Sequence, residues 1–393
     1  MAVVWLLTAC EPAGVRSLSL ADMEGSGEPH LSVTSDGRVV LSYLSAVGGI
    51  PELRYRTLTD RTWSEPQTIT RGADLLVNWA DFPAVVQVGE GLWAAQWLVK
   101  EAGAGYAYHA YAALSDDDGQ TWQAPRRLHS DSSATEHGFV SLYADAAGVG
   151  AFWLDGRRYA EDDPAMELRH KRIYPAASAG TDTETIVDSL VCDCCQTDAA
   201  VTSAGAVVVY RDRTAAEIRD IYVARPVAEG WQQTRVAQDG WEINGCPVNG
   251  PAIAASGEVA VVAWFSGHPA NRVQVAFSRD AAATFAPAIE IDGDTAVGRV
   301  DVALLNNHSA IVSWLRRGSG DFVFRRVDRN GVLGEISIVS PMATHRNAGF
   351  PRMVKAGDRL VFAWTDTQGE GSRVRSAEIA LPVALDSQSL ASP

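Results

Sequence analysis

The sequence predicts an all-β protein that folds as one seven-bladed β-propeller, a closed ring of seven four-stranded sheets. Three observations lead to this prediction. A unit of about 50 residues recurs seven times, each unit contains short strand-forming runs, and no apolar pattern with the helical period of about 3.6 residues persists. A repeat of this length is typical of a propeller blade, and a ring of six blades is the alternative.

The second strand of each unit is recognised most easily, because it is apolar and carries an aromatic residue near its end. The seven runs are VVLSYL (39–44), LWAAQWL (92–98), VGAFWLD (149–155), AVVVYRD (206–212), VAVVAWF (259–265), SAIVSWL (309–315) and RLVFAWTD (359–366). Their aromatic residues follow one another at steps of 54, 56, 57, 54, 50 and 50 positions: Tyr43, Trp97, Trp153, Tyr210, Trp264, Trp314 and Trp364. Packing between blades needs large apolar side chains at this period, so we expect these rings in the core.

The third strands alternate apolar and polar residues, as in ELRYRTL (52–58) and NRVQVAFS (271–278). The seventh unit ends at RVRSAEIAL (373–381) without a fourth strand, and VRSLSL (15–20) precedes the first unit without a partner. Pairing of these two segments completes the last blade and removes an exposed sheet edge. We therefore expect a single propeller domain over residues 15–382 and a flexible tail over 383–393.

Turn motifs mark the connection between third and fourth strands. SDDDGQTW (115–122) fits the pattern Ser-x-Asp-x-Gly-x-Thr-Trp, SRDAAATF (278–285) is a degraded copy, and TLTDRTW (57–63) is a shortened one. The Asp accepts backbone N–H bonds, the Gly supplies a positive φ, and the aromatic residue plugs the space between blades. In these motifs the chain resembles the BNR or Asp-box repeat propellers, of which bacterial exo-sialidases are the best known. The resemblance covers nearly the whole chain and implies the fold, not the activity, because Asp boxes are structural.

Charge and the N-terminus bear on partners and location. The formal net charge of −15 excludes a nucleic-acid partner, and no apolar run approaches the about 20 residues of a membrane span. Residues 1–10, MAVVWLLTAC, resemble a bacterial lipoprotein signal with Cys10 as the lipidated residue. This predicts a lipid-anchored protein of the cell envelope that faces the periplasm or the cell exterior. The alternative is a buried N-terminal strand.

One face of the ring is expected to hold the site. In a propeller, the loops that enter first strands and the loops between second and third strands lie on the same face, at the mouth of the central channel. Arginines and carboxylates gather in these loops and suit a carboxylate or sulfate group, as in an acidic glycan or another anionic small ligand. The expected catalytic residues are Asp155, Arg158, Arg211, Arg213 and Asp301. The expected ligand-binding residues are Asp81, His137, Arg157, Asp212, Asn249, Arg299 and Arg316.

Three classes of function fit this face. The resemblance to exo-sialidases implies a glycoside hydrolase in which arginines clamp a carboxylate, a carboxylic acid transfers protons, and Tyr159 or Tyr210 is the nucleophile. The Phe/Tyr-Arg-Ile-Pro motif of sialidases is absent, since Arg16 is followed by SLSL, so no catalytic residue carries over by motif. The second class is a lipid-anchored propeller that binds an anionic glycan, a peptide or a partner protein on the same face without catalysis. For the chain as a whole we expect a monomer without a cofactor, unless the cysteines hold Cu or Zn.

The third class, a soft-metal protein, arises from the cysteines. Cys192, Cys194 and Cys195 lie before the fourth unit, and Cys246 lies before the fifth, so the four meet in one sector of the mouth. Outside the cytoplasm the expected state is a disulfide between Cys246 and one of the other three. The alternatives are a Cu(I) or Zn(II) site, with His137 one blade away, and free buried thiols.

Overall fold

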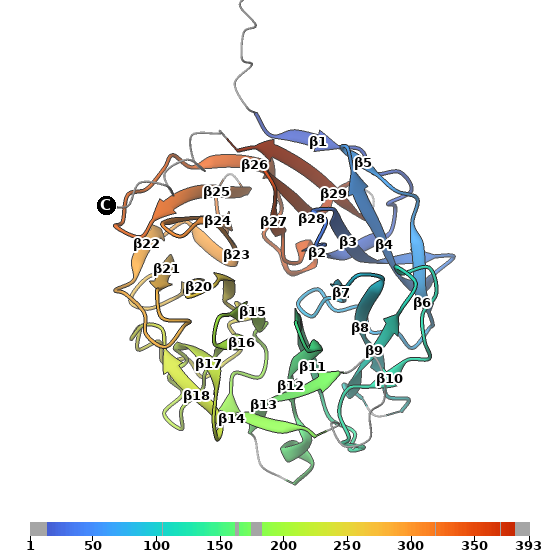
Figure 1. The fold of residues 1–393 in the computed structure, drawn as a ribbon, viewed down its shortest axis with the longest axis horizontal. Coiled ribbons are helices and arrows are strands. Elements are labelled where there is room, and N and C mark those ends of the chain that lie inside the picture. Colours follow the sequence, from blue (N-terminus) through green and yellow to red (C-terminus); the bar gives the residue numbers. More distant parts are fainter. Residues whose placement is uncertain are drawn as a thin grey trace, which may run out of the picture.

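Seven sheets are arranged around a central axis in the computed structural model (Figure 1). It describes residues 14–103, 105–161, 165–173, 183–318, 320–369 and 371–381. Six sheets have four strands, and the first blade has five because its outer strand is divided into β5 and β6. The ring therefore has seven blades, as predicted, and the six-bladed alternative is excluded. The lipidation signal with Cys10 and the tail 383–393 lie outside the described residues.

The strands of each blade run antiparallel from the axis outward. The inner strands are β2 (Ser26–Val33), β7 (Ala84–Gly89), β11 (His137–Asp145), β15 (Asp198–Thr202), β19 (Ala252–Ser256), β23 (Ala296–Asn306) and β27 (Arg352–Ala356). The second strands are β3 (Val39–Val47), β8 (Leu92–Lys100), β12 (Gly148–Asp155), β16 (Gly205–Arg211), β20 (Val259–Ser266), β24 (Ser309–Arg316) and β28 (Arg359–Gly369). All seven predicted second strands are thus confirmed.

The outer half of each blade is more variable. The third strands are β4 (Ile50–Thr59), β9 (Tyr108–Ser115), β13 (Met166–Ile173), β17 (Ile221–Val227), β21 (Arg272–Ser278), β25 (Asp321–Asp328) and β29 (Gly371–Ala380). The outer strands are β5 (Thr62–Trp63) with β6 (Gln67–Arg71), β10 (Arg126–Arg127), β14 (Thr185–Val191), β18 (Gly230–Arg235), β22 (Ile289–Asp292), β26 (Ser337–Pro341) and β1 (Arg16–Leu18). Two short 3₁₀ helices, η1 (Arg157–Glu161) and η2 (Arg346–Ala348), lie in loops.

The N-terminal strand closes the ring. β1 pairs with β29, with Arg16 opposite Glu378 and Leu18 opposite Ser376. The hydroxyl of Ser376 donates to the carbonyl of Leu18 at 3.2 Å and accepts from the indole N–H of Trp63 at 2.9 Å. The predicted pairing of 15–20 with 373–381 is therefore confirmed, and the first and last blades are joined by hydrogen bonds as well as by strand pairing.

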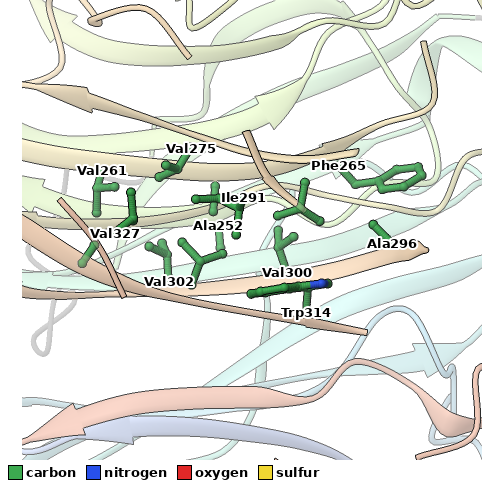
Figure 2. Packing of buried hydrophobic residues seen from close by; sticks show 14 of the residues in the cluster. Ala252, Val261, Phe265, Val275, Ile291, Ala296, Val300, Val302, Trp314 and Val327 are labelled. Atoms are coloured by element: carbon green, nitrogen blue, oxygen red, sulfur yellow. The ribbon is translucent and has the colours of Figure 1, made fainter. Parts of the chain in front are cut away.

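Apolar clusters lie between neighbouring blades. Figure 2 shows one of them, in which Val261 and Val275 of the fifth blade pack against Val302 and Trp314 of the sixth. Trp153, Trp264 and Trp314 are 0% exposed and Trp364 is 6% exposed. The prediction that the recurrent aromatic residues form the core is confirmed, because each ring fills the space between two sheets.

The two longer turn motifs have the same hydrogen bonds. The carboxylate of Asp117 accepts from the backbone N–H and the hydroxyl of Thr121 at 2.8 and 2.6 Å, and Gly119 has a φ of +82°. Asp280 accepts from Thr284 in the same way, at 2.9 and 2.6 Å. These turns join third to fourth strands, on the face opposite the predicted site. Within the described residues no helix is long and apolar enough to span a membrane.

Candidate functional site

The loops that enter the inner strands, and those that join second to third strands, lie on one face of the ring, which we call the mouth face. Two neighbouring blades present cysteines there. Residues 192–197 precede β15 of the fourth blade, and residues 236–251 precede β19 of the fifth. A third loop, 212–220, joins β16 to β17 beside them. The topology therefore brings Cys246 and the triplet to one sector, as the sequence indicated.

The four sulfur atoms form one contiguous group, which we call the thiol cluster (Cys192, Cys194, Cys195 and Cys246). Sγ of Cys192 lies 3.4 Å from Sγ of Cys195 and 3.8 Å from Sγ of Cys194. The sulfur of Cys194 also lies within 4.8 Å of the Cys246 sulfur and of a carboxylate oxygen of Asp193. Cys192 and Cys195 are buried, Cys194 is half-buried and Cys246 is exposed. The cluster thus extends from the interior to the surface of the mouth face.

A buried arginine lies against the thiol cluster. Arg219, whose side chain is 3% exposed, directs Nη1 to Sγ of Cys192 at 3.1 Å and to Oδ1 of Asp193 at 3.4 Å. Its Nη2 donates to Oε2 of Glu217 at 2.8 Å. A guanidinium in van der Waals contact with a sulfur favours the thiolate form, which is both the nucleophile and the metal ligand.

The thiols of the cluster differ in acidity. Hydrogen bonds from Cys194 and Cys195, followed by the positive charges of Arg211 and Arg219, hold the pKa of the Cys192 thiol well below its usual range. Burial raises the pKa of Cys195 to about 12. The hydrogen bonds with Cys192 and Cys195 raise the pKa of Cys194 above its usual range. Among these three thiols, negative charge is therefore favoured on Cys192.

The distances between the sulfur atoms can be compared with those of a disulfide bond and of a metal site. All four residues are free thiols, so the bridge expected from Cys246 is not formed in this structure. A tetrahedral ion bound at about 2.3 Å sets its sulfur ligands about 3.8 Å apart. The Cys192–Cys194 distance is 3.8 Å and the Cys192–Cys195 distance is 3.4 Å, both well above the about 2.05 Å of a disulfide bond. The sulfurs are therefore in contact without a covalent bond between them.

Arg211, which the sequence placed among the catalytic residues, joins two blades. It is 1% exposed and donates to the backbone carbonyl groups of Arg219, Asn249 and Phe265 at 2.7 to 3.2 Å. Its guanidinium carbon lies 4.9 Å from the ring centroid of Trp241. The carbonyl groups at the junction of blades four and five take up its donors, so the contacts of Arg211 in this structure are structural.

Arg299 has the same role at the junction of blades six and seven. It is 5% exposed and donates to the carbonyl groups of Gly349, Thr344 and His345 at 2.7 to 3.2 Å. Burial lowers the pKa of Arg299 to about 10, which still leaves it charged at neutral pH. Its guanidinium carbon lies 5.1 Å from the ring centroid of Trp79. Arg299 is therefore a second arginine that the sequence placed at the site and the structure places in the framework.

The other four predicted arginines are partly exposed on the mouth face, and each has a neighbour of its own. Arg157 pairs with Asp155 and Glu184, Arg158 donates to the carbonyl of Ser189, Arg213 pairs with Glu217, and Arg316 pairs with Asp292. They come from blades three, four and six. The single clamp expected from the sequence is not assembled by these contacts.

Three predicted polar residues cross-link inner strands. The side-chain oxygen of each accepts a backbone N–H from the next blade: Asp81 from Phe139 at 2.6 Å, Asn249 from Arg299 at 2.7 Å, and Asp301 from Met353 at 2.8 Å. Asp81 and Asp301 are 3% and 4% exposed. Their carboxylates accept hydrogen bonds across the junctions between blades and hold neighbouring strands in register.

The two remaining predicted acids differ in protonation. Burial would raise the pKa of Asp155, but hydrogen bonds from Arg157 outweigh it and lower the pKa to about 2, so this carboxylate does not donate a proton at neutral pH. Burial, followed by the charge of Asp188, raises the pKa of Asp212 to about 7. Asp212 is therefore the predicted acid best suited to proton transfer. His137 is fully buried 3.5 Å from Asp155, between blades two and three.

Two residues of the site were not predicted. Arg219 lies in the EIRDIY segment between the second and third strands, so the rule that selected Arg211 applied to it equally. Asp193 lies inside the cysteine triplet and was overlooked beside the sulfurs. The loop positions are visible in the sequence, whereas the direction of each side chain depends on the acceptors that the folded loops provide.

Comparison with known proteins gives similarity in fold. No family model matches the sequence, and no curated protein matches it. A solved structure of a protein of unknown function from Dyadobacter fermentans is similar with a TM-score of 0.53 and 12% identity, over 94% of this chain and 98% of that one. A variant of NanB sialidase from Streptococcus pneumoniae is similar with a TM-score of 0.49 and 12% identity, over 98% and 73%. A Hadza microbial sialidase is similar with a TM-score of 0.45 and 13% identity, over 74% of this chain and 63% of that one. At these identities the likeness concerns the fold alone.

Proposed function

We propose that this protein binds a soft metal ion, Cu(I) or Zn(II), through the thiol cluster on its mouth face. One observation carries the proposal. The four cysteines of the described chain come from two different blades, and their sulfurs nevertheless form one contiguous group with separations of 3.4 and 3.8 Å at its centre. Thiolates are the ligands that select Cu(I) and Zn(II) among biological metal ions.

The surroundings of the thiol cluster fit ion binding. Cys192 and Cys195 supply buried sulfurs, and the exposed Cys246 gives an incoming ion access from solvent. Several thiolates around one ion carry excess negative charge, which Arg219 partly neutralises from 3.1 Å. Asp193 adds an oxygen within 4.8 Å of Cys194 and Cys246. The rigid inner ends of two blades therefore present a mixed sulfur–carboxylate ligand set.

The reduced full chain is expected to bind one Cu(I) or Zn(II) at the thiol cluster in competition with a chromophoric chelator. Cu(I) binding is followed by its thiolate-to-metal charge-transfer absorption in the ultraviolet. Cys192→Ser and Cys195→Ser each remove a buried ligand and are expected to weaken binding at least about hundredfold, above the range for an outer-sphere partner. Asp193→Asn is expected to weaken metal binding less than either serine substitution does. All measurements use the Cys10→Ser background, so that only the four clustered thiols are counted.

The matched control is Ser203→Ala, an exposed turn of the same blade on the opposite face, which is expected to bind as the parent chain does. Two results contradict the proposal. One is a chain whose four thiols react freely with a thiol reagent in the presence of either ion. The other is rapid formation of a Cys192–Cys195 disulfide under mild oxidation, seen by mass spectrometry as the loss of two hydrogen atoms, with no ion retained by the reduced form.

We propose further that the protein is anchored outside the cytoplasm through a lipid on Cys10, because residues 1–10 have the pattern of a lipoprotein signal. Growth with a clickable fatty acid is expected to label the parent chain and to leave the Cys10→Ser variant unlabelled and out of the membrane fraction. Recovery of an unmodified chain that begins at Met1 in that fraction contradicts this location.

Binding of an acidic glycan is the second candidate, and polar groups beside the thiol cluster favour it. The hydroxyl of Tyr159 lies 3.4 Å from Oδ2 of Asp193, a tyrosine–carboxylate pair of the kind that glycoside hydrolysis uses. Arg158 and Arg213 are partly exposed on the same blades. The serine variants separate the candidates: glycan-array binding or sialoside hydrolysis that is lost in Tyr159→Phe and Arg158→Ala, but kept in Cys192→Ser, identifies this function instead.

A further inference from the structure

Three histidines gather between the second and third blades, away from the thiol cluster. His109 lies in β9, His129 follows β10, and His137 begins β11. One ring nitrogen of each lies within 4.8 Å of the other two. Their exposed fractions are 3%, 3% and 0%, so the group is enclosed by the two sheets. Residues from two blades are thereby brought together without any sequence motif that joins them.

Five of the six ring nitrogens of these histidines lack a hydrogen-bond partner among the described residues. Within the described chain, Nδ1 of His109 and both nitrogens of His129 and His137 make no hydrogen bond. Each buried polar group left unpaired costs about 1–3 kcal/mol, so a ligand that takes up the lone pairs of these rings stabilises the fold. The rings of His129 and His137 stack at 3.7 Å between centroids and 4° between planes. Two cations at that distance repel, so neutral rings with available lone pairs are favoured.

Carboxylates border the three rings. Oδ2 of Asp131 lies 2.9 Å from Nε2 of His137, outside hydrogen-bond direction, and Oδ1 of Asp155 lies 3.5 Å from the same atom. A carboxylate oxygen of Glu101 contacts Nε2 of His109. Arg157 neutralises Asp155, which leaves Asp131 and Glu101 to balance the charge of a divalent cation.

We infer that His109, His129 and His137 bind a divalent transition-metal ion of the Zn(II) class that fastens blade two to blade three. Three imidazoles with a neighbouring carboxylate form the donor set that Zn(II), Co(II) and Ni(II) take, whereas the thiol cluster is suited to softer ions. Tetrahedral Zn–N bonds of about 2.0–2.1 Å place the nitrogens about 3.3 Å apart, so small rotations of the rings complete the site. Burial of all three rings makes the ion a structural clamp.

The test uses the full chain in which Cys192, Cys194, Cys195 and Cys246 are replaced by serine, so that only nitrogen and oxygen ligands remain. This chain is expected to retain one Zn(II) after gel filtration and to unfold at a higher temperature with the ion than after chelation. Co(II) is expected to give d–d absorption without a thiolate charge-transfer band. His129→Gln is expected to weaken Zn(II) binding at least about hundredfold, and His308→Gln, at an exposed turn, is the matched control.

Anomalous scattering at the zinc edge, measured on crystals of the parent chain, covers the case in which His129→Gln does not fold. The inference expects an anomalous peak among the three imidazoles. It is overturned if the serine-substituted chain retains no Zn(II), Co(II) or Ni(II) and gains no thermal stability from them, or if the crystals of the parent chain show no anomalous peak among the three imidazoles. The four clustered thiols are absent from the first experiment, so it measures the histidine site alone. A negative result there does not bear on metal binding by the thiol cluster, which the serine variants and the Ser203→Ala control test separately.

Discussion

Arg211→Ala is expected to lower the free energy of unfolding by about 3 kcal/mol or more, because three buried carbonyl groups lose a donor at about 1–3 kcal/mol each. The side chain is 1% exposed and donates four hydrogen bonds to carbonyl groups of Arg219, Asn249 and Phe265. Removal of the Arg211 side chain takes a hydrogen-bond donor away from each of these carbonyl groups at the junction of blades four and five. Each carbonyl group that is left unsatisfied costs about 1–3 kcal/mol. Urea unfolding, followed by tryptophan fluorescence, measures the loss.

Arg213→Ala is the matched control for Arg211→Ala, two positions along the same loop. Arg213 is partly exposed and pairs with Glu217 at 2.7 Å, so its removal is expected to change stability by about 1 kcal/mol or less. If Arg211→Ala unfolds at the same urea concentration as the parent chain while a ligand of the mouth face is lost, the structural role assigned to Arg211 is wrong and the arginine belongs to the site.

The contrast between Arg211 and Arg213 shows which features of the site can be predicted from the sequence. The repeat predicted that both arginines lie at the mouth face, because the loop that follows each apolar second strand lies on that face. All seven second strands and the closing strand were located in this way. The direction of Arg211 was not predictable, since it depends on carbonyl groups of residue 249 and residue 265, which only the folded ring brings near.

The two clusters of metal-binding residues differ in the same respect. Three of the clustered cysteines lie within four positions of the sequence, and the repeat placed Cys246 in the next blade, so the thiol cluster was predictable. The histidines carry no such signal. His109 lies within a third strand and His129 in the segment after a fourth strand, and only the packing of blade two against blade three joins them to His137. Contacts between blades are the part of a propeller that a repeat pattern does not encode.

A carboxylate between blades makes stability depend on pH. Asp81 is 3% exposed and accepts the backbone N–H of Phe139 at 2.6 Å. Burial, with a further contribution from Glu136, raises the pKa of Asp81 from 3.8 to about 7. Because the folded-state pKa exceeds the unfolded-state pKa, the group stabilises the fold fully below 3.8, and this contribution is lost as the pH rises to about 7.

Asp81→Asn is therefore expected to gain stability relative to the parent chain as the pH rises from 4 to 8. Asparagine resembles the protonated carboxyl group in shape, keeps an oxygen for the Phe139 N–H and stays neutral at every pH in this range. A shift of about three pKa units at about 1.4 kcal/mol each sets the change in relative stability at about 4 kcal/mol. Urea midpoints of the two chains, compared at several pH values, measure it.

Asp198 provides an internal standard for this prediction, because it accepts the backbone N–H of Ile253 at 2.8 Å in the corresponding place between blades four and five. Burial raises the pKa of Asp198 to about 6, so Asp198→Asn is expected to show a smaller change that is complete at a lower pH. Asp116→Asn, at an exposed turn, controls for the loss of a surface charge. If the stability difference between Asp81→Asn and the parent chain is the same at pH 4 and pH 8, Asp81 ionises as freely in the folded ring as in the unfolded chain, and the buried cross-link does not exclude its charge.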